Sequence, residues 1–386
     1  MKRSKATAAT LLIMAALLAT ACTSVASPEG WAAPVQTDSV LLATLDKGEL
    51  TAIDLKDGSP LWTFPPKDLN VELEGLYGDP VVMGDKVYFG TYSGDFYVLD
   101  VASGAPVWPP LETDGVIVGG AALAGGSVYV GSGDGKLYVL DAETGEPRWT
   151  FKADDAIWST PVVSEGVVYV TTMGGSVYAL DAETGDPKWA QPFEAGGAIA
   201  STPALSGGAL FFGAFDSMVY ALDAESGQAM WSFKGGNWFW GEPLVEGDVV
   251  FAGDLDGRMH ALSVADGAPR WPQPFHAPAP IRAAPALAEG ALVLADRDGN
   301  VYGLDPASGQ EMWSFALASG VLADLREVDS AEGTVVYVST SDGDIEKVSP
   351  ANGSHTSLTL ALPTATPAAP TPTTPEASPL PATPTP

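Results

Sequence analysis

The chain is poor in cysteine, histidine and positive charge. Among its 386 residues there is one cysteine, Cys22, and there are three histidines, and 18 Lys and Arg stand against 48 Asp and Glu. A single cysteine excludes an intramolecular disulfide. The net charge of −30 argues against nucleic acid as a partner, because such a surface repels phosphate backbones. It suits cationic partners, or serves solubility alone.

The sequence also lacks the short motifs of common enzyme classes. It contains no nucleophile elbow, phosphate loop or CxxC, and its histidines have no metal-ligand spacing. The Asp-x-Asp-Gly pairs at 254–257 and 296–299 resemble a calcium loop only faintly, since the remaining oxygen ligands are missing. They are therefore expected to be hairpin turns. No convincing helical period follows residue 21, which excludes a helical solenoid.

The N-terminus has the pattern of a targeting segment. Three basic residues precede an apolar run, Ala6–Ala19, that is too short to span a bilayer comfortably and ends in LLATAC. The pattern resembles a bacterial lipoprotein signal, although Ala19 stands where Leu is more usual. It predicts a signal at 1–21, a linker at 22–30 and an extracytoplasmic protein tied to a membrane by lipid on Cys22. The alternative is ordinary secretion with a free Cys22.

One unit recurs along most of the chain. Ala179–Trp189 reads ALDAETGDPKW, with Asp third, Gly seventh and Trp eleventh. Successive Trp positions lie 40 to 46 residues apart, and a fixed period of about 40 residues is typical of a propeller blade or a solenoid. The repeated tryptophans are Trp62, Trp108, Trp149, Trp189, Trp231, Trp271 and Trp313.

Each repeat carries the pattern of four short strands. Gly166–Thr171 and Ser176–Asp181 alternate apolar and polar residues around a Gly-Gly turn, with further strands expected at Ser159–Val163 and Lys188–Phe193. Four antiparallel strands make one blade, so residues 31–360 predict an all-β, eight-bladed β-propeller. In the eighth repeat Ser357 replaces the Trp, which marks the expected seam with blade one.

Architecture explains the recurring residues. The Asp can accept backbone N–H bonds in a turn. The Gly relieves a positive φ, and the Trp ring can cover the backbone of the next blade. A residue needed in every blade serves the blade, so these positions are expected to be structural.

The repeated unit resembles the tryptophan-docking motif of pyrroloquinoline-quinone (PQQ) repeat propellers. That family includes quinoprotein alcohol dehydrogenases and the lipoprotein of the outer-membrane β-barrel assembly machinery. The resemblance covers about 330 residues and implies an eight-bladed fold. It does not imply a bound cofactor.

Positions that differ between repeats are the candidates for function. Alignment on the strand-one Pro shows a variable position three residues earlier, which we expect to ring the mouth of the central channel. Its aromatic and basic members, with the nearby Trp238, could stack on a flat ligand, a sugar or a peptide; alternatively, they pack on one another and plug the channel. Asp79, Glu242 and Asp324 stand one residue before the Pro position and could share a cation. The expected mouth residues are Trp31, Tyr77, Trp158, Trp238, Trp240 and Arg282, with Ala200, Val118 and Leu322 in the other blades.

The last residues, 361–386, are Pro, Thr and Ala with a single charge, Glu376. Such a segment cannot bury a core and predicts an extended, polyproline-like tail.

These features favour a non-catalytic, monomeric interaction scaffold without a cofactor, whose partner is an unknown protein or small ligand. The first alternative is a ligand-sensing propeller that uses the aromatic mouth. The second is a PQQ- and calcium-dependent dehydrogenase. The resemblance implies large insertions and often adjacent cysteines for such an enzyme, and this chain has neither.

Overall fold

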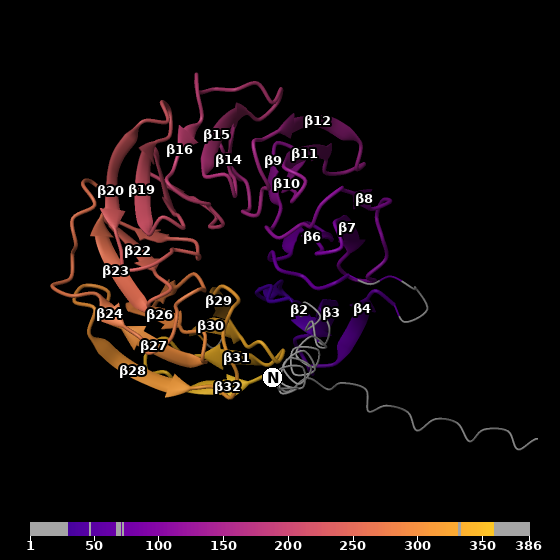
Figure 1. Ribbon diagram of the computed structural model, residues 1–386. Helices are drawn as coiled ribbons and strands as arrows, with labels where there is room; N and C mark the ends of the chain where they lie inside the picture. The colour runs from indigo at the N-terminus through magenta and orange to yellow at the C-terminus, as the bar shows by residue number, and fades with distance from the viewer. Residues whose placement is uncertain (1–29, 46–47, 67–70, 72, 331–332, 359–386) are drawn as a thin grey trace, which may run out of the picture.

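The chain forms a closed ring of eight four-stranded antiparallel sheets (Figure 1). The computed structural model describes residues 30–45, 48–66, 71, 73–330 and 333–358. Each blade uses four consecutive strands, and the blades follow one another around the ring in chain order. The predicted eight-bladed β-propeller is confirmed. Cys22, the signal segment and the tail lie outside the described residues.

The strand bounds follow the 40-residue period. Blades 1 to 4 are β1 (Val35–Gln36), β2 (Val40–Leu45), β3 (Glu49–Asp54), β4 (Pro60–Phe64); β5 (Val81–Met83), β6 (Lys86–Gly90), β7 (Asp95–Asp100), β8 (Leu111–Glu112); β9 (Ala122–Ala124), β10 (Ser127–Gly131), β11 (Lys136–Asp141), β12 (Pro147–Lys152); β13 (Val162–Ser164), β14 (Val167–Thr171), β15 (Ser176–Asp181), β16 (Phe193–Glu194). Blades 5 to 8 are β17 (Ala204–Ser206), β18 (Ala209–Gly213), β19 (Met218–Asp223), β20 (Ala229–Lys234); β21 (Leu244–Glu246), β22 (Val249–Gly253), β23 (Arg258–Ser263), β24 (Phe275–His276); β25 (Ala286–Ala288), β26 (Ala291–Ala295), β27 (Asn300–Leu304), β28 (Glu311–Ala316); β29 (Arg326–Ser330), β30 (Gly333–Ser339), β31 (Ile345–Val348), β32 (His355–Ser357).

The outer strand alternates between two forms. In blades 1, 3, 5 and 7 it has five or six residues and contains the Trp. In blades 2, 4 and 6 it has two residues and begins after the Trp. The fourth strand expected at Lys188–Phe193 is therefore wrong. Pro192 cannot donate a ladder hydrogen bond, and pairing resumes only at β16.

The recurring Asp and Gly hold turns, as expected. In blade 3, the Asp141 carboxylate accepts the backbone N–H groups of Glu143 (3.0 Å) and Thr144 (2.9 Å). These bonds and one from Arg148 hold the pKa of Asp141 well below its usual value, the Arg148 bond contributing most. At the Asp134-Gly135 hairpin, Gly135 has φ = +77°, as predicted for these turns.

Each repeated Trp docks on the turn of the following blade. A Cβ built on Gly309 would lie 2.6 Å from the Trp271 ring, and one on Gly104 would lie 2.6 Å from the Trp62 ring. All seven tryptophans meet a turn glycine in this way, so only Gly lets the indole lie flat on the backbone. The seven docked glycines are Gly104, Gly145, Gly185, Gly227, Gly267, Gly309 and Gly353.

The carbonyl group beneath each docked indole receives its hydrogen bond in two different ways. In blade 5, Trp231 Nε1 donates to Val264 O at 2.8 Å. In blade 2, the Tyr88 hydroxyl donates to the corresponding carbonyl, Ala142 O, at 3.0 Å, and Trp108 Nε1 has no partner among the described residues. Blade 3 repeats this exchange with Tyr129 and Trp149, while blade 4 directs both donors to Ala224 O. A tyrosine on the second strand thus competes with the docking Trp for one carbonyl.

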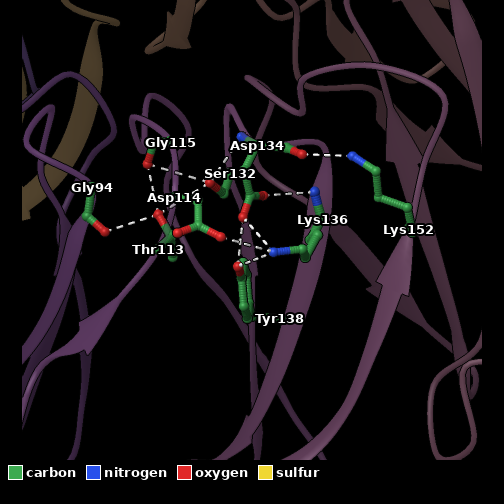
Figure 2. A network of polar contacts seen from close by, with 9 residues as sticks. All are labelled: Gly94, Thr113, Asp114, Gly115, Ser132, Asp134, Lys136, Tyr138 and Lys152. Atoms are coloured by element: carbon green, nitrogen blue, oxygen red, sulfur yellow. Dashed lines mark hydrogen bonds and ion pairs between the residues drawn. The ribbon is translucent and has the colours of Figure 1, made fainter.

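Polar contacts add to the docking between blades 2 and 3 (Figure 2). The Asp134 carboxylate accepts bonds from Tyr138 (2.6 Å) and Lys136 (3.0 Å). Burial opposes ionisation there, but these hydrogen bonds leave the pKa of Asp134 below its usual value. From the same turn, Ser132 donates to Thr113 Oγ1 (3.1 Å), in the loop that follows blade 2.

The ring closes by packing between blades 8 and 1, which lie side by side at the lower edge of Figure 1. Among the described strands none pairs across this seam. Leu41 and Ile53 of blade 1 bury against Tyr337 and Ile345 of blade 8, and Tyr337 Oη donates to Gln36 Oε1 at 2.6 Å. Ser357 is exposed, so the seam lacks the Trp dock, as the sequence predicts.

Within the described residues, no helix is long or apolar enough to cross a membrane.

Candidate functional site

The loops that connect each outer strand to the next inner strand gather around one end of the central axis. Each loop is held by the β-hairpin of its own blade, for example through Met173 N–H to Ala156 O (2.8 Å) in blade 4. Together these loops line a cavity of about 400 Å³, within the size range of small-ligand sites. We call this end the mouth face. All eight aligned variable positions line the cavity: Trp31, Tyr77, Val118, Trp158, Ala200, Trp240, Arg282 and Leu322.

A guanidinium group occupies the centre of the aromatic wall. The Arg282 Cζ lies 4.1 Å from the Trp31 ring centre and 4.0 Å from that of Trp240, so the cation contacts both indoles. Burial lowers the pKa of Arg282 to about 10, so the group is still charged at neutral pH. Its Nε has no hydrogen-bond partner among the described residues. The rings thus pack together in part, as the alternative interpretation expected.

Trp238 does not line the cavity, contrary to the expectation for it. Its side chain is 46% exposed and stacks on Phe215, with ring centres 4.8 Å apart and planes 6° apart. Between Trp238 and Trp240, the side chain of Phe239 points the opposite way and is buried in the sheet core. Phe215 also stacks on Trp240 at 5.1 Å, so it links Trp238 to the mouth.

The three acidic candidates line the cavity or its wall, but they are not equivalent. Asp79 accepts the N–H of Ala33 (2.6 Å) and pairs with Arg326, whose Nε lies 3.0 Å from Asp79 Oδ2. Asp324 accepts the N–H of Ala284 at 2.7 Å. In both cases the carboxylate reaches back to the equivalent position of the preceding blade. The Thr160 hydroxyl accepts the equivalent backbone N–H of Gly120, and the Thr202 hydroxyl accepts that of Thr160. This position therefore links neighbouring blades.

Glu242 is the polar residue at this position that makes no such bond. It accepts no hydrogen bond from the described residues, and its largely buried side chain lines the cavity. Burial, and after it the nearby charge of Asp324, raise the pKa of Glu242 to about 7. Burial and the Asp79 charge likewise raise the pKa of Asp324. Glu242 is therefore the carboxyl group of this wall whose charge changes close to neutral pH.

The possibility that these three side chains share a cation gains no support from their arrangement. Among the described residues, no group of three or more His, Cys, Asp or Glu is arranged to hold a metal ion. Asp79 is instead neutralised by Arg326. The Asp254 and Asp296 carboxylates cap their own hairpins, since Asp254 Oδ1 accepts the N–H groups of Asp256 and Arg258 at 3.0 Å each.

Two residues of the mouth were missed by the sequence analysis. Arg326 lines the cavity at the first position after the strand-one Pro, where the other blades have Val, Ala or Leu. That substitution is a usable signal. Phe215 sits at the tip of a hairpin, and nothing in its local pattern distinguishes it from a turn residue.

Comparison with known proteins identifies the family of this propeller. The family model described as outer membrane protein assembly factor BamB matches residues 16–118, 110–234 and 215–369. The chain belongs to this family. It is a BamB-like propeller built from PQQ-like repeats.

Solved structures agree on the fold. BamB from Moraxella catarrhalis superposes with a TM-score of 0.66 at 20% identity, covering 81% of this chain and 92% of that one. The computationally designed Ika8 protein gives a TM-score of 0.70 at 18% identity, covering 83% and 96%. At these identities the likeness concerns the fold alone.

One relative found by sequence comparison is named as an enzyme. The quinohemoprotein alcohol dehydrogenase ADH IIB of Pseudomonas putida is 31% identical over 88 residues. The match spans 22% of the BamB-like chain and 13% of that enzyme, about the length of two repeats.

Proposed function

We propose that this BamB-like propeller is a non-catalytic, extracytoplasmic scaffold for protein–protein interaction, tethered to a membrane by lipid on Cys22. The family match from residue 16 to residue 369 carries the proposal, because the family is described as an assembly factor. The recurring residues support it, since the docking tryptophans, turn glycines and capping aspartates all stabilise the ring. A rigid ring offers two faces for partners.

The scaffold works without PQQ or calcium. Arg282 occupies the space between Trp31 and Trp240, so a flat quinone would have to displace a cation from both indoles. The acidic wall is divided between an ion pair, an inter-blade bond and one unpaired carboxyl group. These residues do not fit a quinone with a bound calcium ion.

The tether is tested by lipid labelling. Cys22→Ala should abolish incorporation of a labelled fatty acid and release the protein from the membrane fraction. Ser24→Ala is the matched control and should change neither. Retention of the Cys22→Ala protein on the membrane would show that the tether is wrong.

The scaffold is tested by site-specific photo-crosslinking in the native envelope. One crosslinking residue replaces Trp238 on the mouth face and another replaces Gly247 in the turn between β21 and β22, at the other end of the blade. A single adduct of defined mass from one position, removed by excess unlabelled propeller, is the expected result. Equal and diffuse labelling from both positions would contradict a docking surface.

A ligand-binding role of the mouth is the second candidate, favoured by the cavity of about 400 Å³ and its aromatic lining. An enzyme assay distinguishes the scaffold and the ligand-binding role from catalysis. Purified protein incubated with PQQ and calcium should give no alcohol-dependent dye reduction; turnover that follows PQQ addition would refute the proposal.

A further inference from the structure

The mouth cavity contains a guanidinium group whose donors the fold does not use. The Arg282 Cζ lies over the rings of Trp31 and Trp240, at 4.1 and 4.0 Å from their centres. These contacts hold the group in place but do not satisfy its N–H groups. Its Nε is buried and has no hydrogen-bond partner among the described residues. Since buried donors in folded proteins are normally paired, this group is suited to an acceptor that enters the cavity.

A carboxylate is the acceptor that fits this group. The guanidinium N–H groups form a planar fork that matches the two oxygens of a carboxylate. Burial, and after it the positive charge of Arg297, lower the pKa of Arg282 to about 10, and Asp324 acts in the opposite sense. Arg282 is thus charged at neutral pH, with a second cation nearby. A doubly charged phosphate is less favoured, because the protein has a net charge of −30.

The same cavity has carboxyl groups that are not neutralised by the protein. Asp79 pairs with Arg326, whose Nε lies 3.0 Å from Asp79 Oδ2. Asp324 uses Oδ1 for the Ala284 N–H, at 2.7 Å. Glu242 accepts no hydrogen bond from the described residues, and after burial the charge of Asp324 is the next cause of its raised pKa. A cation placed beside Glu242 and Asp324 would relieve this repulsion.

The two kinds of charge remain separate within the cavity. Asp324 is near enough to Arg282 to act on its pKa, but among the described residues the ion pair of this wall joins Asp79 to Arg326. A ligand with a carboxylate and an ammonium group would therefore meet a partner for each. Such a zwitterion has no net charge, so the acidic surface of the protein does not repel it.

A third feature of the cavity is an aromatic ring that no other ring covers. Trp158 lines the cavity from blade 4, is partly exposed and contacts no other aromatic ring among the described residues. Trp31 and Trp240 differ, because both contact Arg282. A flat ring of a ligand can stack on Trp158. The cavity volume of about 400 Å³ suits a small molecule of amino-acid size.

We propose that the mouth binds a free aromatic amino acid, with its carboxylate on Arg282, its ammonium group beside Glu242 and its ring on Trp158. This inference rests on the ligand-binding role of the mouth proposed above and adds the class of ligand. The three residues come from blades 7, 6 and 4. The bound amino acid therefore contacts three blades at once.

The test compares three probes by isothermal titration calorimetry on the purified protein. Phenylalanine carries both charged groups, hydrocinnamate lacks the ammonium group, and phenethylamine lacks the carboxylate. The titrations are run at about pH 8, above the pKa of Glu242 of about 7. Phenylalanine should bind with a Kd on the order of 1 mM or below. The other two probes should each bind at least about tenfold more weakly, because each lacks one charged hydrogen-bonding group.

Variants assign each contact to its residue. Arg282→Gln should weaken phenylalanine about tenfold and leave phenethylamine unchanged. Glu242→Gln should weaken phenylalanine and phenethylamine but not hydrocinnamate. Trp158→Ala should weaken all three probes, whereas Trp238→Ala, outside the cavity, is the matched control and should change none. Far-UV circular dichroism confirms that each variant is folded; if Arg282→Gln is not, the comparison of the three probes on the wild type still tests the carboxylate contact.

The outcomes separate this inference from the functions proposed above. Hydrocinnamate or phenethylamine binding as tightly as phenylalanine would overturn the zwitterion and leave the mouth as a ligand site. Loss of binding that is equal for all three probes in Arg282→Gln would also overturn it. Absence of saturable binding by every probe would refute the amino-acid site, while the scaffold would still be judged by photo-crosslinking.

Discussion

The exchange between tyrosine and tryptophan at the docking carbonyls predicts unequal effects of the same substitution in two blades. In Trp231→Phe the hydrogen bond from Nε1 to Val264 O (2.8 Å) is lost. In Trp108→Phe no such bond is lost, because Tyr88 already donates to Ala142 O and Trp108 Nε1 has no partner among the described residues. Both variants also lose ring area, which is common to them.

The expected difference follows from the worth of one hydrogen bond. Trp231→Phe should lower the free energy of unfolding by about 1 kcal/mol more than Trp108→Phe, with a range of roughly 0.5–1.5 kcal/mol. Trp108 is the more buried of the two, so the loss of ring area works against this difference. Urea unfolding followed by far-UV circular dichroism measures it.

A rescue variant tests the cause. Phe211 occupies in blade 5 the place of Tyr88 in blade 2, with its ring centre 5.8 Å from that of Trp231. Adding Phe211→Tyr to Trp231→Phe should place a hydroxyl donor at Val264 O and recover most of the difference. Equal losses in the two single variants, or a double variant no more stable than Trp231→Phe, would refute the competition between the two donors.

Three further predictions concern the docks, the mouth and the polar network. Gly267 and Gly247 both have positive φ, but a Cβ on Gly267 would lie 2.6 Å from the Trp231 ring, whereas one on Gly247 meets nothing within 4 Å. Gly267→Ala should therefore lower the free energy of unfolding in urea by roughly 1–3 kcal/mol more than Gly247→Ala. Similar losses in the two variants would show that the indole does not rest on Gly267. The raised pKa of Glu242, about 7 against an ordinary 4.5, means that the wild type loses stability as pH rises from about 4.5 to about 7. Glu242→Gln should remove this loss and stabilise the protein by on the order of 2 kcal/mol at pH 8 but not at pH 4, as thermal unfolding at the two pH values would reveal; a gain of equal size at both would contradict a buried, titrating carboxyl group. The lowered pKa of Asp134 acts in the opposite sense, since its contribution is present above the ordinary pKa near 3.8 and is lost as pH falls through the lower folded value. Asp134→Asn should thus destabilise the protein by roughly 1–3 kcal/mol at pH 7 and by less at pH 2.5, and a pH-independent cost would indicate a purely steric effect.

The fold could be predicted because its determinants repeat. A turn glycine beneath an indole is required at seven interfaces, so the same three residues recur at fixed spacing and identify the blade. The outer strands could not be placed as well, since the prolines that shorten β8, β16 and β24 fall inside stretches with a strand-like pattern. Alternation between long and short outer strands became visible only in the hydrogen-bond ladder.

The location of the mouth residues could be predicted from the sequence, but the contacts among them could not. Alignment on one Pro places eight residues around the axis because every blade begins its inner strand at the same depth, and all eight line the cavity. The interactions among them depend on contacts between different blades. Arg282 of blade 7 meets Trp240 of the neighbouring blade 6 and Trp31 of blade 1, and no local sequence pattern encodes these contacts. Trp238 was misplaced for the same reason, because its partner Phe215 belongs to another blade.

The division of labour in this propeller follows from where repetition stops. At the rim, the Trp of one blade packs on the turn that the Gly and Asp of the next blade form. A substitution there is expected to change the stability of the ring. At the mouth, the inner girdle of side chain to backbone bonds is made by Asp79, Thr160, Thr202 and Asp324 but not by Glu242. Glu242 is the polar residue at this position that makes no such bond, and it lines the cavity instead. A scaffold needs the first set of residues in every blade, whereas recognition needs only one copy of the second, and Glu242, Arg282 and Arg326 are such single copies at the cavity.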